Sequence, residues 1–330
     1  MTGLIGTRSG LFRVDTVPFE GSERIIDCGR VSQICDSDEV SGTLVAAEEG
    51  LYRLTDTGQT WEAMGVPETN VWAVFVASSG QIYAGTDPAR LFRSSDGGDT
   101  WIELEGLRHQ TTTDIWRSAF TDTAHVRTVT GHPDTPDRLF AGIEVGGLYR
   151  SEDGGDRWSK CEIRDEAGVV QDDIHEIRCL TPDEYIVACG RLSLHDPNHA
   201  AAEGGLYHTT DAGTTWQRLD RDIGPSYYRS LFLHDDELLT CGSTTVPPEW
   251  SGMLDADATM FASTDTGNTF NPVPYPGGPD EMILAYTSDE SHVYAGTGVG
   301  DNGRILRRTS DQTWETVGHV PDDVLSLTVY

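Results

Sequence analysis

A turn motif of the form S/T-x-D-x-G-x-T-W recurs along the chain and limits its fold more than any other feature. Each copy follows an apolar strand, a turn and a second strand of the G-L-Y-R type. Self-similarity at a spacing of roughly 40 to 60 residues is typical of propellers and other repeat arrays, in which one unit cannot bury its apolar face alone. The copies are TDTGQTW (55–61), SSDGGDTW (94–101), SEDGGDRW (151–158), TTDAGTTW (209–216) and TDTGNTF (264–270), with a degenerate SDQTW (310–314) that lacks the glycine.

Each motif carries the residues that a tight hairpin requires. The aspartate can accept backbone N–H bonds inside the turn, and the glycine two residues later supplies a positive φ. The aromatic residue at the end packs between neighbouring sheets. We therefore expect the motif aspartates to stabilise the fold and to take no part in catalysis. They are Asp56, Asp96, Asp153, Asp211 and Asp265.

The repeat resembles the BNR or Asp-box repeat of sialidases, sortilin-type receptors and photosystem II assembly factors, and the resemblance covers nearly the whole chain. It implies a β-propeller whose Asp-box turns lie on the face opposite the ligand site. The order H-V-R-T, E-V-G-G, D-I-H and Y-Y-R is similar to a group of uncharacterised microbial BNR proteins that are often labelled glycosyl hydrolases from the repeat alone.

The alternating apolar runs predict an all-β fold, in which residues 1–330 form a single seven-bladed propeller of four-stranded antiparallel blades. Residues 324–330 are typical of an innermost strand without a successor, and residues 2–30 contain outer strands without a predecessor. Joining them closes the ring and hides both exposed edges, so removal of the last seven residues is expected to open it. The other blades are predicted near residues 31–64, 70–105, 124–165, 172–220, 227–275 and 280–318.

The charge balance predicts an unusual solvent. The chain has 54 acidic and 23 basic residues, a formal net charge of −31, and Lys160 as its only lysine. Repulsion on this scale destabilises a compact state in dilute buffer, whereas molar salt shortens the screening length to about 3 Å. This surface resembles that of salt-in halophiles. Nucleic acid is excluded as a partner, because no basic stripe is present to displace counterions from phosphates.

The chain shows no sign of membrane insertion or secretion. Its first residues, MTGLIGTRSGLFRVD, lack a basic start and an apolar core, and no apolar run approaches about 20 residues. We expect a cytoplasmic monomer without a cofactor. The six cysteines show no CxxC or zinc-type spacing, and we expect them to be reduced core residues.

Three insertions predict where a ligand site lies. They span residues 106–124, 190–204 and 242–259. In a propeller these connections fall on the face opposite the repeat turns. Long loops on one rim of a rigid scaffold are the usual form of a binding site, although three tolerated surface insertions would give the same pattern.

Polar residues at the starts of the innermost strands are expected to surround the central channel on that face. They are His125, Arg127, Asp173, His175, Tyr228 and Arg229, and Glu144 in an E-V-G-G turn should point to the same rim. Aromatic residues nearby could stack on an apolar or sugar face. These are Trp72, Trp116, Tyr227 and Trp250. No metal is expected at His195 and His199, because Pro197 makes their segment a loop and i, i+4 spacing unites ligands only on a helix.

Two functions fit these residues. The first is a binding or assembly module that holds an unknown glycan, small anion or protein without breaking a bond. The second is a sialidase-like glycoside hydrolase, which needs an arginine cluster for a sugar carboxylate, a nucleophile and an acid. The F/Y-R-I-P segment that opens sialidase domains is absent, since residues 11–14 read L-F-R-V. The candidate residues for the hydrolase are Arg127, Arg191 and Arg229 for the cluster, Tyr228 or Glu144 as nucleophile, and Asp173 as acid.

Overall fold

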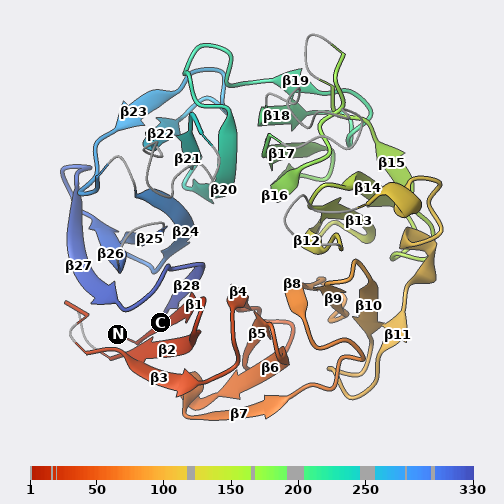
Figure 1. Ribbon diagram of the computed structural model, residues 1–330, viewed down its shortest axis with the longest axis horizontal. Coiled ribbons are helices and arrows are strands. Elements are labelled where there is room, and N and C mark those ends of the chain that lie inside the picture. Colours follow the sequence, from red (N-terminus) through yellow and green to blue (C-terminus); the bar gives the residue numbers. More distant parts are fainter. Residues whose placement is uncertain are drawn as a thin grey trace.

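A computed structural model of the chain is an all-β, seven-bladed propeller of four-stranded antiparallel sheets around a central channel (Figure 1). The structure describes residues 2–15, 18–19, 21–116, 123–164, 168–191, 204–245, 257–278, 281–298 and 302–330. In this part of the chain no helix is long and apolar enough to cross a membrane. The six cysteines all lie within it, and none forms a disulfide with another described residue.

Each blade runs from an innermost strand at the channel to an outermost strand at the rim. From inside to outside, the first blade consists of β28 (Ser326–Val329), β1 (Gly3–Thr7), β2 (Gly10–Val14) and β3 (Glu23–Ile26), and the second of β4 (Val31–Cys35), β5 (Thr43–Ala47), β6 (Gly50–Thr55) and β7 (Thr60–Ala63). The third blade consists of β8 (Val71–Val76), β9 (Ile82–Thr86), β10 (Leu91–Ser94) and β11 (Ile102–Glu103), and the fourth of β12 (Val126–His132), β13 (Thr135–Ile143), β14 (Gly147–Ser151) and β15 (Ser159–Cys161). The last three are β16 (Ile174–Thr181), β17 (Glu184–Cys189), β18 (Gly205–Thr209) and β19 (Gln217–Arg218); β20 (Tyr227–His234), β21 (Glu237–Ser243), β22 (Thr259–Ser263) and β23 (Asn271–Val273); and β24 (Met282–Ser288), β25 (Val293–Gly298), β26 (Gly303–Arg308) and β27 (Trp314–Val320).

The two ends of the chain close the ring, as predicted. Strand β28 pairs antiparallel with β1 from Gly3↔Val329 to Gly6↔Ser326. Beyond the strands, the Tyr330 N–H donates to the Thr2 carbonyl at 2.9 Å. Figure 1 shows both termini beside this blade.

Four of the repeat turns share one hydrogen-bond pattern. Ser94 Oγ accepts the Gly98 N–H and donates to Asp96 Oδ1, both at 2.8 Å, and Asp96 Oδ1 accepts the Thr100 N–H at 2.9 Å. This arrangement satisfies backbone donors that the hairpin leaves unpaired. The same pattern recurs in the turns that begin at Ser151, Thr209 and Ser263.

The turn around Asp56 differs from the other copies. Buried Leu54 occupies the position of the serine or threonine hydroxyl, so the hydroxyl acceptor is absent. Asp56 has a φ of 51° and begins a short 3-10 helix, η1 (Asp56–Gly58). The five copies recognised in the sequence therefore do not form one uniform turn.

Neighbouring blades approach each other closely at glycines in their second strands. A Cβ at Gly142 on β13 would lie 2.5 Å from Ile174 Cγ2 in the next blade, and one at Gly296 on β25 would lie 2.2 Å from Val324 Cγ1. Any side chain at these positions would push the blades apart. The buried aliphatic residues between the sheets fill the remaining space and form the core.

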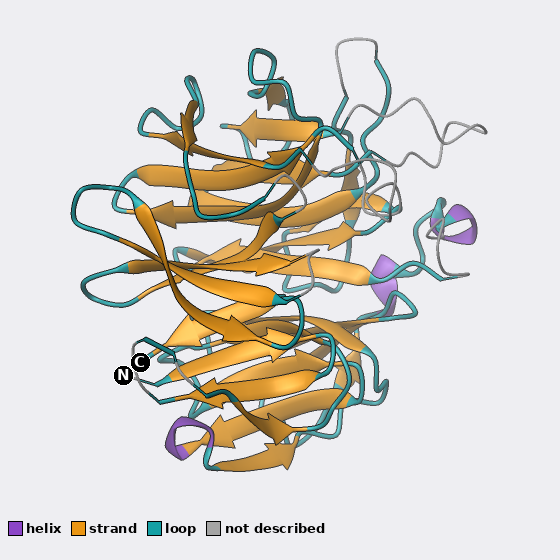
Figure 2. Ribbon diagram, turned by 60° about the vertical axis from the view of Figure 1, so that its left-hand side comes forward, coloured by secondary structure: helices purple, strands orange, loops and turns teal. Residues whose placement is uncertain are grey.

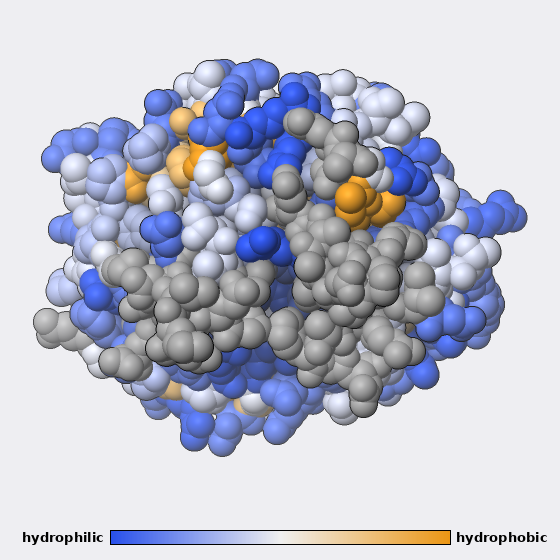
Figure 3. Space-filling model, turned by 45° about the horizontal axis from the view of Figure 1, so that its top comes forward, coloured by the Kyte–Doolittle hydropathy of each residue, from blue (hydrophilic) through white to orange (hydrophobic). Residues whose placement is uncertain are grey.

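The connections alternate between two faces because the strands of each blade are antiparallel. The repeat turns join the third and fourth strands on one face, and the connections from the second to the third strand lie on the other. Figure 2 shows helical turns at both sides of the ring. The insertions begin or end on the face opposite the repeat turns. The first of them begins within η2 (Glu105–Leu107) and contains η3 (Thr113–Ile115). On the face drawn in Figure 3, the described surface is mainly hydrophilic.

Candidate functional site

A β-bulge near the start of six innermost strands marks the mouth of the channel. In each strand the pairing with the second strand skips one residue. A bulge leaves the extra residue out of the ladder and re-aims its side chain. The skipped residues are Ser32, Trp72, Arg127, His175, Arg229 and Leu284, and all six line the channel.

Both faces of the Trp72 indole are covered, one by the Arg30 guanidinium and the other by the His125 ring. The Arg30 guanidinium carbon lies 3.6 Å from the centre of the indole, and the His125 ring stacks on it at 3.7 Å with an interplanar angle of 20°. Two groups this close to one ring centre must occupy opposite faces. Asn70 accepts a 2.8 Å hydrogen bond from Arg30 and fixes the guanidinium there. The expected stacking of Trp72 on a ligand is therefore not available.

Glu144 lies in the turn between β13 and β14 and contacts His125 and Arg127. Its Oε2 lies 3.1 Å from His125 Nε2 and 3.4 Å from Arg127 Nη1. Burial acts to raise the pKa of Glu144, but His125 and Arg127 lower it well below its usual range. Glu144 is thus an ionised carboxylate held by two neighbours.

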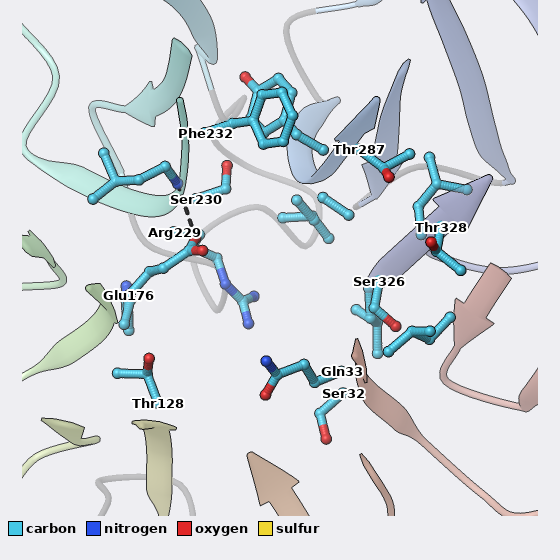
Figure 4. A pocket seen from close by; sticks show the side chains of 18 of the residues that line it. Ser32, Gln33, Thr128, Glu176, Arg229, Ser230, Phe232, Thr287, Ser326 and Thr328 are labelled. Carbon is cyan, nitrogen blue, oxygen red and sulfur yellow. Dashed lines mark hydrogen bonds between the residues drawn. The ribbon is translucent and has the colours of Figure 1, made fainter. Parts of the chain in front are cut away.

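Among the described residues, Arg229 is the cation without a close partner. No hydrogen bond or ion pair joins its guanidinium to another described residue. Burial acts to lower the pKa of Arg229, while Tyr227 and the carboxylates of Glu144, Asp323 and Asp173 raise it, so the side chain stays charged. Figure 4 shows it extending into the middle of the channel.

Arg127 and Arg229 converge on one small cavity at the channel mouth. Burial lowers the pKa of Arg127 most, and electrostatic repulsion from the Arg229 guanidinium lowers it further. The cavity has a volume of about 90 Å³ and adjoins the wider channel of about 380 Å³, with which it shares most of its lining residues. Its lining residues are Arg8, Arg30, Ser32, Trp72, Arg127, Arg229, Leu284 and Leu325.

His175 and Asp173 form a buried pair beside this cavity. His175 Nδ1 lies 2.6 Å from the Tyr228 carbonyl oxygen, and its Nε2 lies 3.3 Å from Asp173 Oδ1. Because a carbonyl can only accept, Nδ1 carries a proton. A Cβ at Gly190 would lie 2.1 Å from Asp173 Oδ2, so the chain leaves space for the carboxylate by having no side chain there.

Tyr228 was predicted to line the channel but lies in the core instead. Its ring is fully buried between blades, and its hydroxyl donates to the Pro225 carbonyl at 3.3 Å. Burial raises its pKa far above the ordinary value. Tyr227 is the tyrosine beside the cluster, where its ring meets that of His175 edge to face at 5.0 Å. Burial raises the pKa of Tyr227 to about 12, so its hydroxyl is neutral.

Two further candidates, Arg191 and Trp116, do not join the cluster. Arg191 donates to the Thr244 carbonyl at 3.1 Å and lines a separate cavity with Arg218 and Arg221. Trp116 is buried against Tyr149, with ring centres 5.3 Å apart, and so belongs to the core. Trp250 lies outside the described residues.

Sequence reasoning missed Arg30 and Arg8. Arg30 precedes Ser32 by two residues, as His125 precedes Arg127, so period-two alternation would have found it. Arg8 lies in the loop between β1 and β2 and pairs with Asp323 at 2.6 Å. No local pattern marks it.

The described residues contain no cluster that could hold a metal. They include no group of three or more His, Cys, Asp or Glu side chains in a ligating arrangement. His195, Asp196 and His199 lie outside the described residues, so the prediction that they bind no metal stays a prediction. Four arginines line the mouth cavity, and two of them, Arg127 and Arg8, pair with the carboxylates of Glu144 and Asp323.

Two curated proteins resemble the chain. A xyloglucanase of Hypocrea jecorina (strain QM6a) is 30% identical over 96 residues, which is 27% of this chain and 12% of that protein. The photosystem II assembly lipoprotein Ycf48 of Synechococcus sp. (strain CC9902) is 23% identical over 294 residues, covering 85% of this chain and 73% of that protein. The chain thus spans a small part of the first and most of the second.

Solved structures share the fold at low sequence identity. A GH74 xyloglucanase from Xanthomonas campestris superposes with a TM-score of 0.61 at 16% identity, over 96% of this chain and 46% of that one. Ycf48 bound to a D1 peptide gives a TM-score of 0.55 at 14% identity, over 87% and 81%. The family described as the DUF6242 beta propeller domain matches residues 36–232, more than half of the chain. The chain therefore belongs to the DUF6242 beta propeller family.

Proposed function

We propose that this chain is a non-catalytic binding module that holds the carboxylate of a ligand at the channel mouth. The observation that carries the proposal is Arg229, a charged guanidinium that extends into the channel and has no hydrogen bond or ion pair with another described residue. A secluded cation without a counterion is costly, and a planar carboxylate matches the guanidinium fork. Arg127 lies close enough to supply a second contact.

The contacts of the two nucleophile candidates favour binding over glycoside hydrolysis. The lowered pKa of Glu144 would suit a carboxylate nucleophile, but His125 Nε2 at 3.1 Å and Arg127 Nη1 at 3.4 Å already engage the oxygen that would have to attack the sugar. Tyr228, the other proposed nucleophile, donates its hydroxyl to a backbone carbonyl in the core. A solved Ycf48 propeller is bound to a peptide, which supports a binding role for a propeller of this shape.

The proposal extends to the repeat and the surface. The hydrogen-bonded aspartates of four repeat turns support an Asp-box propeller whose turns lie opposite the ligand site. The net charge of −31 with a single lysine supports a halophile-type protein. Recognition in molar salt must then rely on short bidentate contacts, because long-range attraction is screened.

A thermal-shift titration with sodium acetate, exchanged for chloride at constant ionic strength, tests the proposal. Acetate at about 100 times its Kd should stabilise the fold by about 2.7 kcal/mol. With an unfolding entropy near 2.1 cal/mol/K per residue, or about 0.7 kcal/mol/K for 330 residues, the Tm should rise by about 4 °C.

Variants of the two arginines locate the effect. Arg229→Gln should abolish the acetate shift, and Arg127→Lys should weaken it although the charge is kept, because a lysine cannot form the bidentate contact. Arg307→Gln is the matched control, since Arg307 pairs with Glu315 on the outer part of its blade. An unchanged shift in Arg229→Gln, or release of fluorophore from fluorogenic glycosides by the unaltered protein, would refute the proposal.

A further inference from the structure

The ring of side chains at the channel mouth is chemically one-sided. Passing around the ring, the bulged residues of β8, β12, β16 and β20 are aromatic, cationic or imidazole side chains. The next blade places Leu284 at the bulge of β24, and the blade after it places Leu325 just before β28. Two adjacent blades therefore give the cavity an apolar wall.

Both leucines belong to the site as well as to the scaffold. Each is half-buried and lines the mouth cavity and the wider channel. Leu284 also packs over Gly298, where a Cβ would lie 2.2 Å from Leu284 Cδ1. The Leu325 N–H donates to the Gly6 carbonyl at 2.8 Å, which fixes the backbone at this point. The apolar wall is thus held in place beside the arginines that line the same cavity.

The cations around the cavity set the charge of a matching ligand. Arg127 shares Glu144, Arg8 pairs with Asp323, and Asn70 and Trp72 hold Arg30. Arg229 is the guanidinium among these four that has neither a close carboxylate nor a hydrogen-bonded partner within the described residues. A ligand with one negative charge neutralises it.

The size of the cavity limits the rest of the ligand. Its volume of about 90 Å³ is well below the roughly 300 to 1,000 Å³ of pockets for drug-sized molecules. A carboxylate with a short hydrocarbon group fits such a space, and a longer group would extend into the channel of about 380 Å³. An oligosaccharide does not match this volume or the leucine wall.

We infer that the mouth selects a short-chain aliphatic monocarboxylate, whose carboxylate contacts Arg229 and Arg127 and whose hydrocarbon contacts Leu284 and Leu325. This inference rests on the proposed binding function and adds the class of ligand to it. Binding involves no bond rearrangement. The arginines supply the attraction common to all carboxylates, and the leucines supply the preference among them.

A series of sodium salts from acetate through propionate and butyrate to isovalerate tests the inference by isothermal titration calorimetry. The affinity should rise about fourfold for each added carbon, which corresponds to about 0.8 kcal/mol per buried CH₂. Leu325→Ser and, separately, Leu284→Ser should flatten this series, because each removes apolar surface that the added carbons would contact. The more conservative Leu325→Thr should flatten it partly, which guards against loss of folding in the serine variants.

Leu233→Ser is the control, because Leu233 is an exposed leucine on β20 and should leave the whole series unchanged. If acetate binds but affinity does not depend on chain length, the inference fails and the proposed function stands. If succinate binds more tightly than butyrate, the inference fails because the site prefers a dianion. If none of the salts binds, both the inference and the proposed function fail.

Discussion

Ser151→Ala should destabilise the propeller through one repeat turn. Ser151 Oγ accepts the Gly155 N–H at 2.9 Å and the Asp153 N–H at 3.2 Å, and it donates to Asp153 Oδ1 at 2.9 Å. The first of these bonds is buried, so alanine leaves a backbone donor without its acceptor. An unsatisfied buried donor costs about 1–3 kcal/mol.

The effect should appear as a small, well-defined shift in melting. Dividing about 1–3 kcal/mol by an unfolding entropy of about 0.7 kcal/mol/K for a chain of this length gives a Tm decrease of about 1.5–4 °C. Denaturant titration should show a lower midpoint with an unchanged slope, because the surface exposed on unfolding stays the same. Acetate binding should also stay the same, because the turn lies on the opposite face.

Ser310→Ala provides the comparison, since Ser310 is exposed in the degenerate sixth turn and should leave the Tm unchanged. If Ser151→Ala has the same Tm as the unaltered protein, the Ser151 hydroxyl is not needed as the acceptor for the Gly155 N–H, and the reasoning is refuted. Loss of acetate binding at unchanged stability would contradict the assignment of the two faces.

Three further perturbations test other parts of the reasoning. Raising KCl from about 0.1 M to about 2 M should raise the Tm, because screening weakens the repulsion within a chain of net charge −31; a constant Tm by circular dichroism would exclude the halophile proposal. Deleting residues 324–330 removes the buried side chains of Val324, Leu327 and Val329, worth about 1.5–3 kcal/mol each, so the truncated chain should show no cooperative unfolding transition at 25 °C. The pKa values of Asp96 and Asp211 are lowered to about 2, mainly by hydrogen bonds from Thr100 and Thr215. The stability that these two carboxylates contribute is therefore present above their unfolded pKa near 3.9 and should be lost as the pH falls from about 4 to about 2. A Tm that stays constant over that pH range would contradict this prediction.

The blades could be predicted because their signal is local and repeated. The recurring turn and the alternating apolar runs specify four strands per unit, and the unmatched run at residues 324–330 required a partner at the other end of the chain. The exception at Asp56 was also visible in the sequence, because Leu54 replaces the hydroxyl residue that the other good copies have. A comparison of that one position across the five copies would have distinguished the Asp56 turn from the others.

The site was less predictable because it depends on which way each side chain points. Alternation correctly unites His125 with Arg127 and, in the same way, Arg229 with Tyr227; choosing Tyr228 shifted the pattern by one residue. Arg8 comes from a loop more than two hundred residues from Arg229, and its position at the mouth follows from ring closure. The sandwich that covers both faces of Trp72 depends on packing that no spacing encodes.

The pairing of β28 with β1 gives the folding reaction a long-range step. Its partners Gly3 and Val329 are separated by nearly the whole sequence, so closing the ring carries a loop entropy cost of about 5 kcal/mol on the scale (3/2)RT ln n. Contacts of this separation form slowly, because the entropy is lost before the contacts form. The blades from β4 to β27 each pair strands that are neighbours in sequence and can form earlier. Amides in β1 and β28 should therefore gain protection from hydrogen exchange last during refolding.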